Sequence, residues 1–233
     1  MTEYIDKPTR NCADCDVRCP LFNYLSPDEL EMIDGNKLTV LFKKGETIRK
    51  QGTFMSHVLS LNSGFAKLYL EGIEQRNTII RIVKPGNFIG GPGIYLDQMH
   101  HYTVTALEES MVCFIEVPVF RKIIDSNKEF AHEFMKDFSR NILSVYNRLV
   151  FLTQKQMPGR LADTLIYLFE EIFEQSKFKL TLSKQDLADL SAMSKESAIK
   201  VLRSFQNEGI IRVGEHDIEL VDPDALRRIS RFG

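Results

Sequence analysis

The residues of this chain most suited to chemistry are four cysteines, three of them close together near the start. Cys12, Cys15 and Cys19 are separated by two and three residues, and Cys113 stands alone. In a reducing compartment, thiols grouped in this way favour metal binding or redox chemistry over structural disulfides. For Cys113 the alternative is a small buried residue of a strand, which is a common use of cysteine.

The histidines make a poorer case for chemistry. Five are present, and only His100 and His101 are adjacent. Neighbours on a strand point to opposite faces, so this pair would be a poor chelate for a cupin-type metalloenzyme. We expect both in an exposed loop, with haem ligation as the alternative. His132-Glu133 lacks the second histidine of a zinc-protease motif, and neither a phosphate loop nor a serine elbow is found. The sequence therefore predicts no enzyme.

A second group of residues has the spacing of two short helices joined by a tight turn. Ser183 and Asp186 form a helix-start box, and Ser194 can cap a second helix. Glu196 falls in the first turn of that helix, where the helix dipole favours an acid. Gly209 is well placed to end it. The segments 210–213 and 218–221 then read as a two-stranded wing. The pattern predicts a winged helix-turn-helix.

The predicted second helix has an apolar stripe and a polar face. The stripe has helical spacing: Ala198, Val201, Leu202 and Phe205. Lysine and arginine on the polar face can donate to phosphates or guanine, and a glutamate can accept from cytosine. Including the caps, we predict a DNA-contacting set made of Ser183, Ser194, Lys195, Glu196, Ser197, Ile199, Lys200 and Arg203. The alternatives are a small helical subdomain without DNA binding, or a regulatory module that binds a protein partner.

Composition and charge indicate the class of protein that carries these cysteines and helices. The chain has 233 residues, 43% hydrophobic and 27% charged, which is ordinary for a globular protein of one or two domains. Net charge is −2, so any DNA surface must be local. No apolar run has the roughly 18 residues of a membrane span, and no secretory signal is visible at the start. We expect a cytoplasmic protein with no membrane partner.

The organisation changes along the chain. Short alternating runs between glycines, from about residue 36 to 118, predict a sandwich or roll. Further on, apolar residues recur about every 3.5 positions in a helix from about 129 to 156, which should stop at Met157-Pro158-Gly159. We interpret this stripe as a dimer seam rather than a face packed on its own domain: Phe134, Phe138, Ile142, Val145, Leu149 and Leu152. Residues 160–173 have helical spacing and 178–182 form a strand candidate.

The whole layout resembles the CRP/FNR family of bacterial transcription regulators. The most specific motifs are Lys44-Gly45-Glu46 with Gly52, Pro85-Gly86-Asn87-Phe88-Ile89-Gly90, Gly159-Arg160-Leu161-Ala162 and Met193-Ser194-Lys195-Glu196-Ser197. The resemblance implies an α+β fold with four parts: a cysteine-containing segment (1–28), a cyclic-nucleotide-binding-like β-roll (29–128), a dimerisation helix and hinge (129–157) and the winged helix-turn-helix (158–233). It implies a homodimer that binds double-stranded DNA and contacts RNA polymerase. Glu196 and Lys200 then occupy the main base-reading positions, although relatives often carry arginine at the latter.

The resemblance also bears on the signal. Members that bind cyclic AMP use a glutamate and an arginine in the roll, and this chain has Gly91-Pro92 and Tyr102-Thr103 at those places. A buried phosphate without a cationic partner is costly, so cyclic AMP is not expected. Another small ligand could occupy the roll, in a pocket that we place at Phe88, Ile89, Gly90, Gly91, Tyr102 and Thr103.

The oxygen-sensing FNR branch fits better. His100-His101 and the run from Ala106 to Cys113 resemble that branch's stretch ending in its distal cysteine. The resemblance implies a [4Fe–4S] cluster held by Cys12, Cys15, Cys19 and Cys113, the four thiolates such a cluster requires. The gap between the second and third cysteines is two residues shorter than in that branch, so zinc and ordinary thiols stay open. A small-ligand or haem-responsive regulator is the alternative for the signal.

Overall fold

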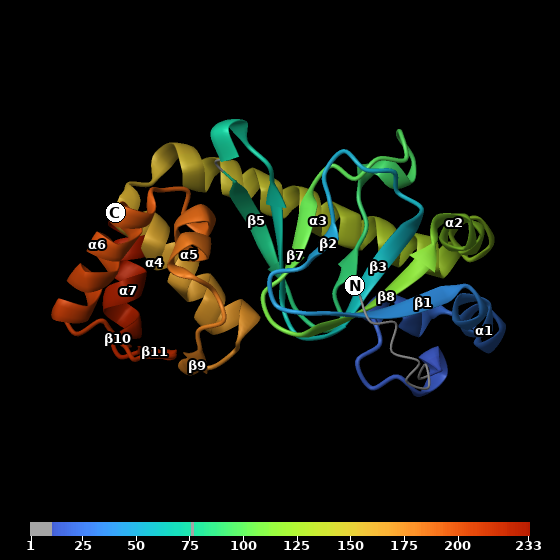
Figure 1. Ribbon diagram of the computed structural model, residues 1–233, viewed down its shortest axis with the longest axis horizontal. Coiled ribbons are helices and arrows are strands. Elements are labelled where there is room, and N and C mark those ends of the chain that lie inside the picture. The colour runs from blue at the N-terminus through green and yellow to red at the C-terminus, as the bar shows by residue number, and fades with distance from the viewer. Residues whose placement is uncertain (1–10, 76) are drawn as a thin grey trace. The chain divides into compact units, whose positions relative to one another are not determined.

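The computed structural model describes residues 11–75 and 77–233. The chain forms two compact units (Figure 1). The described residues of the first are 11–71 and 82–143, and those of the second are 72–75, 77–81 and 144–233. Within these ranges, none of the helices has the length and apolar character that crossing a membrane requires.

The first unit is built around two antiparallel sheets. After the short turns η1 (Cys12–Asp14) and η2 (Pro20–Tyr24) comes α1 (Pro27–Gly35). The strands are β1 (Lys37–Phe42), β2 (Thr47–Arg49), β3 (His57–Ser63), β4 (Ala66–Leu70), β5 (Thr78–Val83), β6 (Phe88–Ile89), β7 (Thr103–Ala106) and β8 (Ser110–Glu116), and residues 78–81 of β5 belong to the second unit. One sheet has the order β1-β8-β3-β6 and the other β2-β7-β4-β5. The predicted roll is confirmed.

Gly64 shows why glycine is required at a turn between two strands of the roll. Gly64 lies between β3 and β4 with φ +77°, a backbone conformation that side chains rarely adopt. A Cβ at this position would also clash with the Glu109 carbonyl oxygen and the Ser110 side chain. Gly64 therefore allows a turn and a close chain approach at once.

An apolar core joins the cysteine segment to the helices that follow the roll. Helix α2 (Val117–Ser126) is followed by α3 (Lys128–Gln154). The ring of Phe120 on α2 lies 5.3 Å from that of Phe134 on α3 and 5.0 Å from that of Phe88. Cys12 and Cys19 are buried in the same cluster. The start of α3 is thus held by its own unit, and the N-terminal cysteines pack in the core that holds it.

Helix α3 ends at Gln154, two residues short of the predicted end. Helix α4 (Met157–Tyr167) begins directly afterwards, with Pro158 in its first turn, where its missing N–H costs nothing. Proline therefore starts a new helix after the break. A π-helical turn (Leu168–Ile172) extends α4, so the predicted helix over 160–173 is present with a change of winding at its end.

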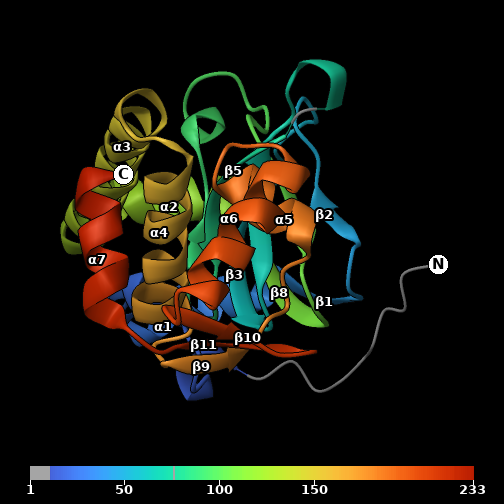
Figure 2. The same cartoon turned by 90° about the vertical axis from the view of Figure 1, so that its left-hand side faces the viewer.

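The second unit is helical with a small sheet. Its elements are β9 (Lys177–Lys179), α5 (Lys184–Leu190), α6 (Lys195–Asn207), β10 (Ile211–Val213), β11 (Asp217–Leu220) and α7 (Pro223–Phe232). The sheet has the order β10-β11-β9. Figure 2 shows α7 running beside α4, which agrees with their close packing. Strand β9 is shorter than the candidate over 178–182, and it joins the predicted wing as a third strand.

Candidate functional site

The helix pair α5 and α6 starts where the cap signals predict. The Ser183 hydroxyl accepts from the Asp186 amide at 3.1 Å, and the Asp186 carboxylate accepts from the Ser183 amide at 2.9 Å. In α6 the Ser194 hydroxyl accepts from the Ser197 amide at 3.2 Å and donates to the Ser197 hydroxyl at 3.0 Å. Both caps satisfy amides that the first turn of a helix leaves free. The helix starts are therefore defined by local chemistry.

Helix α6 separates an apolar stripe from a polar face. Ala198 and Phe205 are buried, while Val201 and Leu202 are half-buried. The opposite face exposes four charged side chains, which are Lys195, Glu196, Lys200 and Arg203. Ser197 and Ile199 are half-buried beside them, and Ser183 is exposed at the start of α5. Donors and one acceptor thus line a face that is free of packing within the described chain.

The end of α6 is fixed by a glycine. Gly209 has φ +72°, its amide donates to the Gln206 carbonyl, and the Ile210 amide donates to the Phe205 carbonyl. This pair of bonds is the Schellman arrangement, which favours glycine at the left-handed position. The chain then enters the wing, where Arg212 and Glu219 lie opposite one another on β10 and β11 and form an ion pair at 2.7 Å.

The turn between α5 and α6 is buried and hydrogen-bonded. The Ser191 hydroxyl donates to the Leu187 carbonyl at 2.7 Å and lies 3.1 Å from the Thr164 hydroxyl of α4. Ala192, the next residue, has φ +49°. Arg148, near the end of α3, donates to the Leu190 carbonyl at 2.6 Å. These bonds fix the angle at which α6 leaves α5.

The predicted ligand pocket of the roll is closed over by a tyrosine. The Tyr102 hydroxyl donates to the Gly90 carbonyl, and a Cβ on Gly91 would lie 3.1 Å from the Tyr102 ring. Thr103 is buried, donating to Glu71 at 2.6 Å and accepting from the Gln51 amide at 3.0 Å. Phe88 and Ile89 are buried on β6. The loop is thus filled by its own side chains.

The prediction of an exposed loop for both histidines is wrong for His100. This side chain is 3% exposed, whereas His101 is exposed and pairs with Asp97 at 3.1 Å. The backbone of His100 is fixed to the turn after β2, since its amide donates to Thr53 and its carbonyl accepts from Gly52. Burial, together with the nearby Arg49 charge, lowers the pKa of His100 to about 4.

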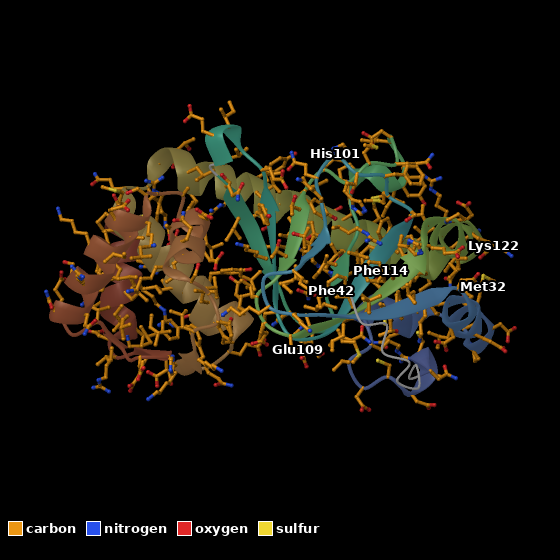
Figure 3. The ribbon with its side chains drawn as sticks, in the orientation of Figure 1. Met32, Phe42, His101, Glu109, Phe114 and Lys122 are labelled. Atoms are coloured by element: carbon orange, nitrogen blue, oxygen red, sulfur yellow. The ribbon has the colours of Figure 1, made fainter. Side chains whose placement is uncertain are left out.

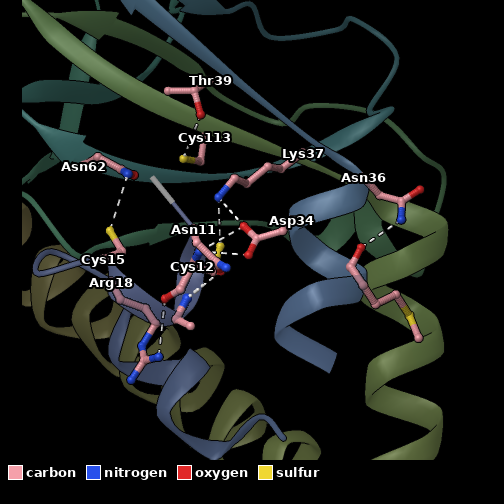
Figure 4. Close-up of polar contacts among 12 residues, drawn as sticks. Asn11, Cys12, Cys15, Arg18, Asp34, Asn36, Lys37, Thr39, Asn62 and Cys113 are labelled. Atoms are coloured by element: carbon pink, nitrogen blue, oxygen red, sulfur yellow. Dashed lines mark hydrogen bonds and ion pairs between the residues drawn. The ribbon is translucent and has the colours of Figure 1, made fainter. Parts of the chain in front are cut away.

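Two of the four cysteines lie near one lysine, Cys12 through a hydrogen bond and Cys113 through its charge. The Lys37 ammonium donates to the Cys12 sulfur at 3.2 Å and pairs with Asp34, whose carboxylate also accepts from the Cys12 amide (Figure 4). The Cys113 sulfur lies 3.5 Å from the Thr39 hydroxyl, and its pKa is raised by burial. Cys15 accepts a long contact of 3.9 Å from the Asn62 amide.

Cys19 packs in the core cluster that also contains Cys12. It is 2% exposed in the apolar core, and burial raises its pKa to about 12. Burial and the Asp34 hydrogen bond likewise raise the pKa of Cys12 to about 12. Within residues 11–75 and 77–233, no group of three or more histidine, cysteine or acidic side chains could hold a metal ion. The four cysteines as arranged do not fit an iron–sulfur cluster.

The predicted dimer seam divides along α3. Phe134 is buried in its own unit, with Phe138 beside it at 6.4 Å between ring centroids. Further along, α3 exposes a run of large apolar side chains: Ile142, Leu143, Val145, Tyr146, Leu149 and Val150, with exposures from 38% to 60%. Leu152 is half-buried. The second half of the helix therefore presents an apolar face to solvent.

Comparison with known proteins decides the family. Residues 39–127 match the cyclic nucleotide-binding domain, and residues 159–229 match the Crp-like helix-turn-helix domain. The chain belongs to the CRP/FNR family of transcription regulators. Helix α6 and the wing are therefore parts of this family's DNA-binding domain.

Relatives match most of the length of this family member. It is 27% identical to Electron transport regulator A of Shewanella oneidensis, over 94% of this chain and 90% of that protein. It is 26% identical to the Fumarate and nitrate reduction regulatory protein of Escherichia coli, over 94% and 90% of the two chains. FixK2 from Bradyrhizobium japonicum has the same fold, with a TM-score of 0.76 at 17% identity over 83% of this chain and 96% of that one.

Sequence reasoning missed several residues of this CRP/FNR protein. Lys37 and Asp34 at the cysteines, and Arg148 at the helix-turn-helix, carry no motif, and only the fold brings them to their partners. The one available signal was a basic residue inside an otherwise apolar stretch, as at Arg148 between Leu143 and Phe151. Such a residue needs a partner if it is buried.

Proposed function

We propose that this protein is a homodimeric, sequence-specific DNA-binding transcription regulator, controlled by a signal that enters through its N-terminal cysteine region. The observation that carries the proposal is helix α6, capped by Ser194, packed through Ala198 and Phe205, and exposing Lys195, Glu196, Lys200 and Arg203. The N-terminal half of such a helix enters the major groove of DNA. The protein then acts by binding, with no catalytic residue assigned.

The exposed half of α3 supports the dimer. Large apolar side chains that face water singly are ordinary, but a continuous stripe along one helix indicates a partner. Ile142, Val145 and Leu149 lie at the spacing of a two-helix seam, so a second copy of the same helix would cover them. Two recognition helices would then lie about 34 Å apart, one turn of DNA. Contact with RNA polymerase stays a prediction of the family resemblance.

The dimer is tested by charging the seam. Ile142→Glu with Leu149→Glu should shift the protein from dimer to monomer in sedimentation, because two buried carboxylates on each helix are strongly unfavourable. Ser144→Glu is the matched control, since Ser144 is exposed on the same stretch of the helix. A double variant that sediments as a dimer and binds DNA as well as the wild type would refute the seam.

Two observations support the cysteines as the point of signal entry. Cys12, Cys15 and Cys113 approach Lys37, Thr39 and Asn62 from separate segments, so a change at one thiol alters the others' surroundings. Cys12 and Cys19 also share the core cluster that contains Phe130 and Phe134 of α3. A chemical change at these thiols would therefore alter the packing around the start of the proposed dimer helix.

The nature of that signal is tested by anaerobic purification, metal analysis and DNA binding before and after air. A cluster would require Cys19 to leave the core, and would appear as about four irons per chain and a visible absorption that bleaches in air. Metal-free protein whose DNA binding changes on thiol oxidation would assign the signal to the thiols themselves. Cys12→Ser, Cys15→Ser and Cys113→Ser are measured in turn, with Cys19→Ser for comparison. If the first three variants respond as the wild type does, signal entry at this site is refuted.

A further inference from the structure

One arginine and two histidines come together in the roll, with His100 buried and Arg49 and His57 half-buried. Arg49 lies on β2, His57 at the start of β3 and His100 in the loop before β7. Burial, and after it the charge of Arg49, lowers the pKa of both histidines. None of these residues belongs to the DNA-binding surface.

The ring of Phe114 on β8 organises two of the three. The Arg49 guanidinium lies 4.4 Å from the centroid of this ring, and the His57 ring meets it edge-on at 6.1 Å. Figure 3 shows Phe114 beside Phe42 in the body of the roll, in agreement with their centroid separation of 6.0 Å. Arg49 therefore reaches from its own sheet to an aromatic residue of the other sheet. His100 is fixed to the same region by its backbone bonds to Gly52 and Thr53.

His100 and Arg49 lack the partners that burial normally demands, whereas Nδ1 of His57 lies 2.8 Å from the Ser56 hydroxyl. Both ring nitrogens of the buried His100 have no hydrogen-bond partner in the described structure. The one hydrogen bond of the Arg49 side chain goes to the carbonyl of its neighbour Ile48 at 3.2 Å. Within the described chain, no carboxylate forms an ion pair with Arg49. Glu71 accepts from the Thr103 hydroxyl, and Glu116 acts on His57 only at a distance.

We infer that Arg49, His57 and His100 form a binding site for a small oxyanion inside the roll. A guanidinium presents parallel donors that match a carboxylate or a phosphate, and each imidazole can add one more donor. A cation is disfavoured by Arg49. A nucleotide is disfavoured by Tyr102, which packs on Gly91 beside this region. This inference concerns ligand binding in the roll, and it does not depend on whether the cysteines receive the signal.

The test is a titration of the full-length protein followed through its histidine ring signals by nuclear magnetic resonance. Sodium acetate and sodium phosphate are added separately at constant ionic strength, with chloride as the background anion. The signals of His57 and His100 should shift and saturate with one anion or both, whereas His101, exposed and paired with Asp97, should not saturate. Glutamine variants of His57, His100 and His101 assign the three histidine signals. Saturation by acetate alone indicates an organic carboxylate ligand, and saturation by phosphate alone indicates a phosphate.

Two variants of the arginine decide the assignment. Arg49→Met keeps the apolar stem on Phe114 and should weaken anion binding at least tenfold, about the loss expected for one charge-assisted bond. Arg49→Lys keeps the charge and should retain part of the affinity, which guards against a misfolded methionine variant. Linear shifts with both anions would mean that only water fills the site and would overturn the inference. Equal affinity in the wild type and Arg49→Met would overturn it as well.

Discussion

Arg148, on the last turns of α3, donates a hydrogen bond of 2.6 Å to the carbonyl of Leu190, the final residue of α5. A second bond from the same nitrogen reaches the Ile79 carbonyl at 3.2 Å, and the guanidinium stacks on the Phe151 ring at 4.3 Å. Burial lowers the pKa of this arginine to about 10. The helix proposed to form the dimer is thus bonded directly to the turn that orients the recognition helix.

Replacing Arg148 by methionine should destabilise the second unit. The change leaves the Ile79 carbonyl without this donor and removes the short bond to Leu190, a loss of about 1–3 kcal/mol for charge-assisted bonds. Thermal unfolding should shift down by about 4–8 °C per kcal/mol for a domain of this size. DNA affinity should fall too, because the turn before α6 loses its support.

Arg140→Met is the matched control, since Arg140 is exposed on the same helix. It should change stability by less than about 0.5 kcal/mol, as surface substitutions do. Equal melting temperatures for the two variants would show that the Arg148 bonds do not stabilise the fold.

Glu196→Ala should relax the sequence preference of DNA binding. Losing one acceptor for a base costs about 1–3 kcal/mol at the affected base pair and little elsewhere. The measurement compares affinities for all half-site variants by fluorescence anisotropy. Glu208→Ala, at the other end of α6, should leave the preference unchanged. An unaltered preference in Glu196→Ala would show that Glu196 does not read a base.

Gly64→Ala should destabilise the roll more than Gly45→Ala. Both glycines have positive φ, +77° and +86°, but a Cβ at Gly45 meets nothing within 4 Å. The Gly45 variant should therefore lose only the conformational term of about 1 kcal/mol, while the Gly64 variant adds a clash with backbone. Chemical denaturation measures the difference. Similar losses would mean that the strands move apart without cost.

Stability should fall in acid partly through His100. Its pKa is about 4 when folded and about 6.5 when unfolded, so the unfolded chain takes up the proton first. The contribution of this residue is complete above pH 6.5 and is lost as the pH falls towards 4, by up to about 3 kcal/mol. His100→Gln should flatten the pH profile over this window, and His101→Gln should not. A profile unchanged by His100→Gln would contradict the burial of a neutral imidazole.

The elements predicted correctly are those whose signals are local. Ser183 with Asp186, Ser194, and Gly209 determine helix ends through bonds within a few residues, so their spacing was sufficient. Strand β5 likewise lies within the region from about 36 to 118 that we predicted as short strands. Strands β2, β6 and β7 were missed because two to four residues are too short to show a period.

What could not be predicted depends on distant parts of the chain. His100 is buried because the turn at Gly52 and Thr53 holds its backbone, far from it in sequence. Cys19 follows Cys12 and Cys15 closely in the sequence, and in the fold it packs in an apolar core with Phe120 and Phe134. Residue types and spacing suggested one set of four ligands, whereas the fold brings Cys12 and Cys113 near Lys37 and Cys15 near Asn62, and buries Cys19 in the apolar core.

The central claim is that two copies of α6 read DNA together. The most direct measurement selects preferred sites from random duplexes and maps the protected bases by hydroxyl-radical footprinting. We predict two inverted half-sites with centres about 10 base pairs apart and two chains bound per duplex. A single half-site protected by one chain, or binding without sequence preference at physiological salt, would contradict the account.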